Sequence, residues 1–505
     1  MKGCLMGGTT VEVVIAGAGP TGLMLACELR LAGVDVLVLE RDAERADAES
    51  RAGGIHARTL EVLDQRGMAG PFLEAGRTMQ GGHFSALRLD FGGLPTRHPY
   101  LLTLLQRRIE RLLEERALQL GARLWRSAEV TGLRQSETAV EVEVRGPDGD
   151  RRLSAAYLVG CDGGRSAVRR LAGIGFPGTP ATLTALLGDV ELTDPPENVL
   201  FQERREHGTF SVLAFEPGWY RVMTTEFDHV ADRDEPVTFE TLRRTCRKIA
   251  GTDYGMHSPR WLSRFGDAAR QADRYRSGRV LLAGDAAHIH FPAGGQGLNL
   301  GVQDAVNLGW KLASVVRGQA PERLLDSYHA ERHPVAGRVL QNTRAQTALS
   351  RTDANTTALR EVMAELIKLD DVNRHLSGML TALDVRYPMD ESCPLAGYRV
   401  PDVDIKAAAG DTSVFALLHG ARGVLLDLGG GGAGVRAVAS SWAGRVDLVE
   451  ARSSAGDWEI PSLGTVPAPG ALLIRPDGHV AWGAGERPDL DGLRAALSTW
   501  FGPEH

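Results

Sequence analysis

The chain has 505 residues, of which 43% are hydrophobic and 24% are charged, the proportions of a folded globular protein rather than of a disordered chain. At roughly 100 to 200 residues per domain, this length predicts about three compact units. The 57 basic and 64 acidic residues give a net charge of −7, which disfavours nucleic-acid and anionic-membrane partners and leaves small molecules as the expected ligands.

The cysteines and the hydropathy pattern indicate the cellular compartment of the protein. The five cysteines are Cys4, Cys27, Cys161, Cys246 and Cys393. They are odd in number and lack C-x-x-C or metal-ligand spacing, so the sequence predicts neither a disulfide framework nor a bound metal. Nowhere does the chain reach the roughly 18 consecutive apolar residues that a membrane helix needs. We therefore expect a cytoplasmic protein.

The N-terminal segment predicts a βαβ unit. Residues 11–16 form a continuous apolar run, typical of a strand buried on both faces. Residues 23–31 have a helical pattern, and residues 34–39 form a second strand. The motif Gly17-Ala-Gly19-Pro-Thr-Gly22, between the first strand and the helix, matches the dinucleotide-binding fingerprint G-x-G-x-x-G.

This fingerprint has a direct physical rationale. Gly17 permits a tight turn, Gly19 lets a pyrophosphate approach the backbone, and Gly22 allows the helix to pack closely on the strand. The helix N-terminus adds free N–H groups and the positive end of a dipole. Glu40, at the end of the second strand, can accept the ribose hydroxyls and would repel a 2′-phosphate. The pocket therefore favours FAD or NAD over NADP.

Two later strands end in glycine and aspartate. Residues 157–161 form a strand that leads into Asp162-Gly-Gly and an arginine-rich helix start. Residues 279–283 form another, followed by Gly284-Asp285, a glycine-rich loop from Pro292 to Asn299, and a helix predicted over residues 300–316. This second arrangement aims a helix N-terminus at an anion or a carbonyl dipole, and a reduced flavin is such a ligand.

In their order and spacing, these three segments resemble the class A flavoprotein monooxygenases, the para-hydroxybenzoate hydroxylase-like aromatic hydroxylases. Residues 49–61, 106–107, 326–332 and 473–482 extend the resemblance over nearly all of the chain. The sequence is most similar to the hydroxylases that modify angucycline, anthracycline and related aromatic polyketides.

The resemblance implies an α/β fold of three parts. A Rossmann-like FAD-binding domain of the GR2 type would comprise residues 1–175 and 266–393, with a helical segment up to 393. A β-sheet substrate domain, residues 176–265, would be inserted into it. A thioredoxin-like C-terminal domain would comprise residues 394–505, and because it contains no cysteine, thiol redox chemistry is excluded there. A packing or assembly role remains, and a homodimer is left open.

The resemblance also assigns roles to residues. Gly17, Gly19 and Gly22 would hold the FAD pyrophosphate, Glu40 and Arg41 the adenosine ribose and its surroundings, and Arg51, Gln106 and Arg107 the diphosphate and ribityl region. Asp162 would serve both FAD and transiently bound NADPH, and Asp285 would bind the ribityl chain. The isoalloxazine would be framed by Pro292, Gly295, Gly297, Leu298 and Asn299, with Pro292 and Gly295 forming the catalytic environment of the flavin.

In the implied reaction, NADPH reduces bound FAD, O₂ adds at C4a, and the resulting flavin hydroperoxide hydroxylates a polycyclic phenol or quinone. Side chains alone cannot transfer oxygen to an aromatic carbon, so the cofactor must carry that step. The protein has to supply position and exclude water.

The substrate is expected to bind the middle of the chain. Residues 207–215 and 219–227 form two neighbouring strands around a Pro217-Gly218 turn. Phe210, Trp219, Tyr220 and His290 are the candidate substrate contacts, although most of the aromatic residues of these strands could simply fill a core. His288 and His290 lie two residues apart on an extended segment and point to opposite faces, which argues against a metal pair.

Several alternatives stay open at this point. Residues 429–434 also fit G-x-G-x-x-G after a strand over 424–428, with Glu450 beyond it, but a glycine loop is favoured there over a second dinucleotide site. The same flavin chemistry could serve Baeyer–Villiger or other ring-modifying oxidation, or a reductase. A flavin halogenase is disfavoured because the chain lacks W-x-W-x-I-P. A flavoprotein that binds an aromatic compound without turnover is the remaining possibility.

Overall fold

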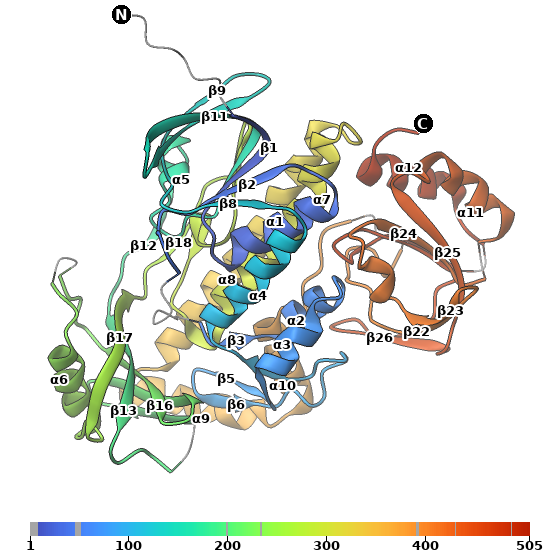
Figure 1. The fold of residues 1–505 in the computed structure, drawn as a ribbon. Coiled ribbons are helices and arrows are strands. Elements are labelled where there is room, and N and C mark those ends of the chain that lie inside the picture. The colour runs from blue at the N-terminus through green and yellow to red at the C-terminus, as the bar shows by residue number, and fades with distance from the viewer. Residues whose placement is uncertain are drawn as a thin grey trace, which may run out of the picture.

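The computed structural model describes residues 9–45, 52–197, 200–232, 235–389, 393–429, 431–485 and 487–504. These residues form a mixed α/β structure with three larger sheets, whose arrangement Figure 1 shows. The first sheet lies with its helices in the upper middle of the view, the second at the lower left, and the third at the right. No helix in the described part of the chain is long and apolar enough to cross a membrane.

The first sheet has a parallel core. Its strands run in the order β8 (Arg123–Trp125), β2 (Val36–Leu39), β1 (Thr9–Ala16), β11 (Gly149–Gly160) and β20 (Val280–Leu282), and all neighbours in this series are parallel. Because parallel strands share a direction, their carboxyl ends meet at one edge of the sheet. The apolar runs expected from the sequence are buried in it, since β2 is buried at all four positions.

Further elements extend and cover this sheet. β10 (Val140–Gly146) pairs antiparallel with the first half of β11, β9 (Glu129–Gln135) pairs antiparallel with β10, and β19 (Arg276–Ser277) pairs antiparallel with β20. The main covering helices are α1 (Pro20–Leu31), α4 (Gln106–Gln119), α7 (Gln296–Val316) and α8 (Asp326–Leu349). α1 packs against both α4 and α7, and α7 begins at Gln296, one turn earlier than the sequence pattern predicts.

Short elements fill the region between the sheets. They are β3 (Gly54–Ile55), α2 (Ala57–Asp64), α3 (Ala69–Ala75), β4 (Arg77–Met79), β5 (Gly82–Phe84), β6 (Leu87–Leu89), β7 (Leu101–Thr103), α5 (Ala167–Leu171), β12 (Gly178–Thr179), β18 (Ala269–Gln271), β21 (His288–Ile289), α9 (Ala354–Ile367) and α10 (Asp370–Thr381). β3, β7 and β4 form one small sheet and β12, β18 and β21 another.

The second sheet is antiparallel, in the order β14 (Leu200–Arg205), β15 (Gly208–Glu216), β16 (Trp219–Glu226), β13 (Thr184–Leu192) and β17 (Met256–Gly266). Helix α6 (Phe239–Ala250) covers one face, which is the outer side of the sheet in Figure 1. The two strands and the Pro217-Gly218 turn predicted from the sequence are present as β15 and β16. The sheet therefore has its other face free to meet the rest of the molecule.

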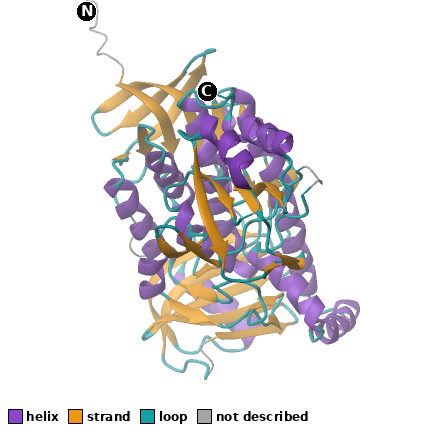
Figure 2. Cartoon of the chain, turned by 90° about the vertical axis from the view of Figure 1, so that its right-hand side faces the viewer, coloured by secondary structure: helices purple, strands orange, loops and turns teal. Residues whose placement is uncertain are grey.

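The third sheet belongs to the C-terminal region. Its order is β23 (Gly410–Ser413), β22 (Asp404–Ala407), β25 (Val446–Ser453), β24 (Gly423–Asp427), β28 (Ala471–Ile474) and β29 (Val480–Ala484). Only β24 and β25 are parallel, and α11 (Gly432–Ala439) connects them. With α12 (Leu490–Phe501), α11 lies beside these strands near the C-terminus (Figure 2). The thioredoxin-like description and the domain boundaries given above stay predictions.

Candidate functional site

Four strand ends bring the sequence motifs to one edge of the first sheet. Gly17 follows β1, Glu40 follows β2, Asp162 follows β11 and Asp285 follows β20. Backbone bonds beyond the strands hold these ends together: the Gly17 N–H donates to the Leu39 carbonyl at 2.7 Å. Ligands of open α/β sheets bind at this kind of edge, outside the carboxyl ends of the strands.

The glycine turn after β1 fits a bound pyrophosphate. Gly17 has a φ of +104°, and a Cβ there would lie 2.4 Å from the Cys161 carbonyl oxygen; a Cβ on Gly22 would lie 2.0 Å from the Gly17 carbonyl oxygen. A Cβ on Gly19 would have no heavy atom of the described residues within 4 Å. The turn is therefore closed on two sides and open in front of Gly19. Helix α1 starts there without a side-chain cap, so its free N–H groups face this opening.

Glu40 is fixed beside this turn. Its Oε2 accepts a hydrogen bond from the Ala18 N–H at 2.8 Å, and its Oε1 accepts one from the Asp42 N–H at 3.0 Å. The neighbouring Arg41 is exposed, pairs with Asp42 at 3.6 Å, and lines an open cavity with Arg145 among other residues. Of the two residues predicted on the adenosine side, Glu40 is therefore held by two backbone N–H groups, whereas Arg41 is exposed and paired with Asp42.

The two later strand ends each present a carboxylate. Asp162 uses Oδ2 to cap α5, accepting from the Ala167 N–H at 2.7 Å and the Val168 N–H at 3.1 Å. Its Oδ1 is buried and has no hydrogen-bond partner among the residues that the structure describes. Asp285 is exposed, in a 3-10 turn from Gly284 to Ala286, rather than buried in the strand end. Among the described residues, no hydrogen bond involves its carboxylate. Acceptors of this kind suit a ligand that carries hydroxyl groups.

The N-terminus of α7 is built on left-handed glycines. Gly294 and Gly295 have φ angles of +70° and +67°, and Gly295 is an N-cap without a side-chain bond, directly after the Pro292 turn. The Nε2 of His56 donates to the Gly294 carbonyl at 2.8 Å. Burial lowers the pKa of His56 to about 4, so the imidazole is neutral at pH 7 and holds this loop as a hydrogen-bond donor.

Asn299 ties the same loop to the segment that precedes α2. Its Nδ2 donates to the Gly295 carbonyl at 2.9 Å and to the Gly54 carbonyl at 3.2 Å, while its Oδ1 accepts from the His56 N–H at 2.9 Å. Asn299, which was predicted to frame the flavin, therefore bonds to backbone groups of both segments and holds them together. His56 is the functional candidate that sequence reasoning missed, although it lies inside the segment 49–61 quoted for the family resemblance.

His290, Gly297 and Leu298 lie around the first turn of α7. The Nδ1 of His290 donates to the Phe291 carbonyl at 2.7 Å, and its Nε2 is buried with no hydrogen-bond partner in the described part of the chain. A Cβ on Gly297 would lie 3.7 Å from that Nε2. Leu298 is partly buried against the main core. Burial lowers the pKa of His290, so this histidine presents a bare nitrogen acceptor beside the helix N-terminus.

Gln106 and Arg107 begin α4. The Oε1 of Gln106 accepts from the Ala52 N–H at 3.1 Å, and so fixes the chain directly after Arg51. Arg51 itself lies outside the described residues. Arg107 forms an ion pair with Glu216 of β15, whose other carboxylate oxygen accepts from Arg260 at 2.8 Å. The structure thus places Arg107 at the junction between the first and second sheets.

Two of the candidate substrate residues, Phe210 and Tyr220, lie on the face of the second sheet that α6 covers. Phe210 is fully buried under α6, where its ring stacks on Tyr254 at 5.4 Å, and Tyr220 packs against the same core. This position favours the core-filling alternative for both residues. Trp219 lies at the strand end, with the Arg260 guanidinium 3.6 Å from its ring centre. On the opposite face, the Phe215 ring lies against Gly53.

A buried polar cluster behind the site was also missed. The Oδ2 of Asp304 accepts from the Gly284 N–H at 3.1 Å and pairs with His288 Nε2 at 2.6 Å, and its Oδ1 accepts from Arg332 at 2.7 Å. Burial alone would raise the pKa of Asp304, but Arg332 and His288 hold it below its ordinary value. This cluster fixes the turn that carries Asp285.

In the second glycine motif, residues 429–434, backbone N–H groups already donate to a carboxylate of the protein itself. The Oδ1 of Asp427 accepts from the Gly429 N–H and the Gly431 N–H, both at 2.9 Å. A phosphate would have to displace this carboxylate, and the two negative charges would repel each other. The geometry therefore favours the predicted glycine loop over a second dinucleotide site.

The comparison with known proteins agrees with this arrangement. Residues 10–343 match the family described as FAD binding domain, and residues 393–503 match the family described as aromatic-ring hydroxylase, C-terminal. The chain is 50% identical to 12-dehydrotetracycline 5-monooxygenase/anhydrotetracycline 6-monooxygenase of Streptomyces rimosus, covering 97% of this chain and 99% of the relative.

Two further similarities show how broad the family is. The solved structure of the anhydrotetracycline hydroxylase OxyS from Streptomyces rimosus superposes with a TM-score of 0.92 at 49% identity, covering 98% of this chain and 100% of that one. A dialkyldecalin synthase of Streptomyces rugosporus is 43% identical over 97% of this chain and 99% of its own length. The relatives therefore include oxygenases and at least one protein named for a different reaction.

Proposed function

The chain belongs to the class A flavoprotein aromatic hydroxylases and is a flavin-dependent monooxygenase, and on this premise we propose that it hydroxylates a polycyclic aromatic polyketide with NADPH and O₂ as co-substrates. The observation that carries the proposal is the convergence of the glycine turn, two free carboxylate acceptors and the uncapped N-terminus of α7 at one sheet edge.

The first sheet would hold the adenosine half of FAD. The open backbone in front of Gly19 and the N-terminus of α1 are suited to the pyrophosphate. Glu40, already oriented by two backbone N–H groups, would accept the ribose hydroxyls. Asp285 would accept from the ribityl chain, because its exposed carboxylate has no other hydrogen-bond partner in the described part of the chain.

The loop from Pro292 to Asn299 would frame the isoalloxazine. The positive end of the α7 dipole favours negative charge on the ring, and His56 and Asn299 keep the loop in that geometry. When bound, FAD would supply the redox chemistry, taking two electrons from NADPH and activating O₂ so that one oxygen atom enters the substrate and the other leaves as water.

The substrate class follows from the relatives and from the second sheet. The relatives reported above are named for the oxidation of 12-dehydrotetracycline and anhydrotetracycline. The face of the second sheet that carries Phe215 contacts Gly53, next to the proposed flavin loop. The aromatic ring of Phe215 is suited to contact with a flat polycyclic ligand. Trp219 and His290 stay candidates for substrate contact.

The test uses the purified full-length chain. We expect a yellow protein whose NADPH oxidation accelerates when a polycyclic phenol or quinone is added, with one ¹⁸O atom from ¹⁸O₂ in the product by mass spectrometry. Oxygen inserted into a ring as an ester would instead indicate the Baeyer–Villiger alternative. Product formed without NADPH and O₂ would indicate a reaction like that of the synthase, and a yellow protein without turnover would indicate a binding protein.

The Asp285 carboxylate is the sharpest single-residue test of the cofactor site. Asp285→Ala removes the acceptor and should weaken FAD binding about tenfold or more, whereas Asp285→Asn keeps one oxygen acceptor and should lose less. Both variants should fold normally, since the side chain is exposed. Retention of stoichiometric FAD and full activity by Asp285→Ala would show that the ribityl chain binds elsewhere.

A further inference from the structure

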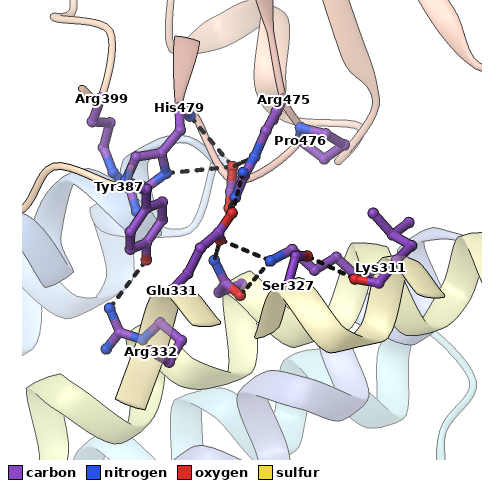
Figure 3. A network of polar contacts seen from close by, with 12 residues as sticks. Lys311, Ser327, Glu331, Arg332, Tyr387, Arg399, Arg475, Pro476 and His479 are labelled. Carbon is purple, nitrogen blue, oxygen red and sulfur yellow. Dashed lines mark hydrogen bonds and ion pairs between the residues drawn. The ribbon is translucent and has the colours of Figure 1, made fainter. Parts of the chain in front are cut away.

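A buried cluster of charges joins the C-terminal region to α7 and α8 (Figure 3). Arg475 donates to both carboxylate oxygens of Glu331, at 2.6 and 2.8 Å, and its Nε donates to Asp477 at 3.1 Å. Lys311 of α7 donates to Glu331 at 2.7 Å. Each of these four side chains is at most 5% exposed.

Stability alone does not account for this cluster. Two cations and two anions compensate one another, but each has lost its hydration, and apolar residues of similar volume are often as stabilising as a buried ion pair. What such a cluster does provide is register, because each charge is satisfied in only one relative position of the elements. The cluster therefore fixes one relative position of the C-terminal region, α7 and α8.

The cluster fixes helix α7 along its length. Asp304, Asn307 and Lys311 are spaced by three and four residues, so they lie on one face of the helix. The Nδ2 of Asn307 donates to Glu331 at 2.6 Å and to Asp477 at 3.2 Å. The C-terminal region thus holds the middle of the helix whose N-terminus forms the proposed flavin frame.

A second set of contacts leads to the turn that carries Asp285. Arg332, next to Glu331 on α8, donates to Asp304 at 2.7 Å and to the Tyr387 hydroxyl at 3.1 Å. The Tyr387 ring stacks on His479 with ring centres 4.2 Å apart, as Figure 3 shows for these labelled residues. Asp304 in turn accepts from the Gly284 N–H. Buried polar contacts therefore run from the C-terminal segment to the edge of the first sheet.

We propose that the segment 475–479 is a positioning element of the flavin site: through Glu331 and Arg332 it sets the axial position of α7 and the geometry of the Gly284–Asp285 turn. None of its residues would touch FAD or substrate. This inference rests on the proposed function, because it requires FAD at this sheet edge.

The test compares Arg475→Lys and Arg475→Met with a matched control in the full-length chain. Arg475→Lys keeps the charge, but an ammonium group with three N–H donors cannot make the four hydrogen bonds of the guanidinium to Glu331 and Asp477. Arg422→Met is the control, because Arg422 lies in the same region and pairs with Asp447, half-exposed and outside the cluster. The measurements are the FAD dissociation constant of the apoprotein, the visible spectrum of bound flavin, and its reduction potential.

We expect Arg475→Lys to fold, to bind FAD about tenfold more weakly and to shift the flavin spectrum and potential, and Arg475→Met to do so more strongly. Arg422→Met should match the wild type. If Arg475→Met does not fold, Tyr387→Phe is the second variant: it removes only the hydroxyl that accepts from Arg332 and should weaken FAD binding severalfold.

Wild-type affinity, spectrum and potential in Arg475→Lys and Tyr387→Phe would overturn the inference, even if both variants melted at lower temperature. A wild-type protein that takes up no FAD would overturn the proposed function instead, so the two failures are distinguishable.

Discussion

Among single residues, the glycines of the turn after β1 are constrained for two different reasons. Gly22 has no room for a side chain, since a Cβ would lie 2.0 Å from the Gly17 carbonyl oxygen, whereas Gly19 has free space on the protein side. Gly22→Ala should therefore destabilise the protein with or without cofactor. Gly19→Ala should leave the melting temperature of the apoprotein unchanged and weaken FAD binding about tenfold or more, because the methyl group occupies the pyrophosphate space.

Thermal melts of the apoprotein and FAD titrations separate these two effects. Equal losses of apoprotein stability in both variants would contradict the assignment of the space in front of Gly19 to a ligand.

His56 gives a pH prediction at the same scale. Its pKa falls from 6.5 to about 4 on folding because of burial, so between these values the unfolded chain binds more protons, and stability must fall as the pH falls. The histidine's contribution is complete above pH 6.5 and should drop by about 2 kcal/mol between pH 7 and pH 4.5. His56→Gln should flatten this part of the profile, measured by urea unfolding at each pH. Parallel profiles would contradict a buried neutral imidazole.

The strand-end residues could be predicted because the sequence pattern that identifies them, an apolar run directly before each residue, is local. Gly17, Glu40 and Asp285 each follow an apolar run, and parallel strands bring their ends together. His56 and Asp304 could not be predicted, because their partners are distant in the chain: His56 bonds Gly294 and Asp304 holds the turn at Gly284. A single sequence shows that such residues are polar, but not which backbone group they satisfy.

At the scale of elements, the second sheet shows that a strand pattern does not predict which face of the sheet a helix will cover. The strands β15 and β16 were predictable from aromatic and β-branched residues around a Pro-Gly turn, but their faces were not. Pairing places Phe210 opposite Thr224 and Val212 opposite Val222, and α6 covers that face. Because side chains alternate along a strand, Phe215 and Arg221 belong to the other face.

The two faces should respond differently to substitution. Phe210→Ala removes a fully buried ring and should cost about 3 to 5 kcal/mol of unfolding free energy without changing the KM for the aromatic substrate. Phe215→Ala removes a half-buried ring beside Gly53 and should raise that KM severalfold with a smaller loss of stability. Denaturant unfolding and steady-state kinetics test both; a larger KM change in Phe210→Ala would reverse the assignment of faces.

At the scale of the whole molecule, length predicted about three units, but not how firmly the last is attached. Arg66 is buried against Glu28 at 2.6 Å and also donates to the Pro476 carbonyl at 2.8 Å and the Leu418 carbonyl at 3.1 Å. Arg399 donates to Gln65 at 2.9 Å. Apart from Arg66 and Glu28, the partners in these contacts are separated by more than 300 residues, so no local sequence pattern predicts them.

These contacts predict how the protein unfolds. If the C-terminal region opened alone, Glu331 would lose Arg475 and Arg66 would lose the Pro476 and Leu418 carbonyls. Both charges would remain buried without these partners, which is strongly unfavourable. Domains joined by small polar interfaces usually move relative to one another. Here the free energy needed to break the buried ion pairs couples the unfolding of the C-terminal region to that of the first sheet. We therefore expect one calorimetric transition, with flavin fluorescence rising at the same temperature as FAD is released.

The variant Arg475→Met should split this transition into two, with the C-terminal region melting first. Two separate transitions in the wild type would show that the buried charges do not couple the regions.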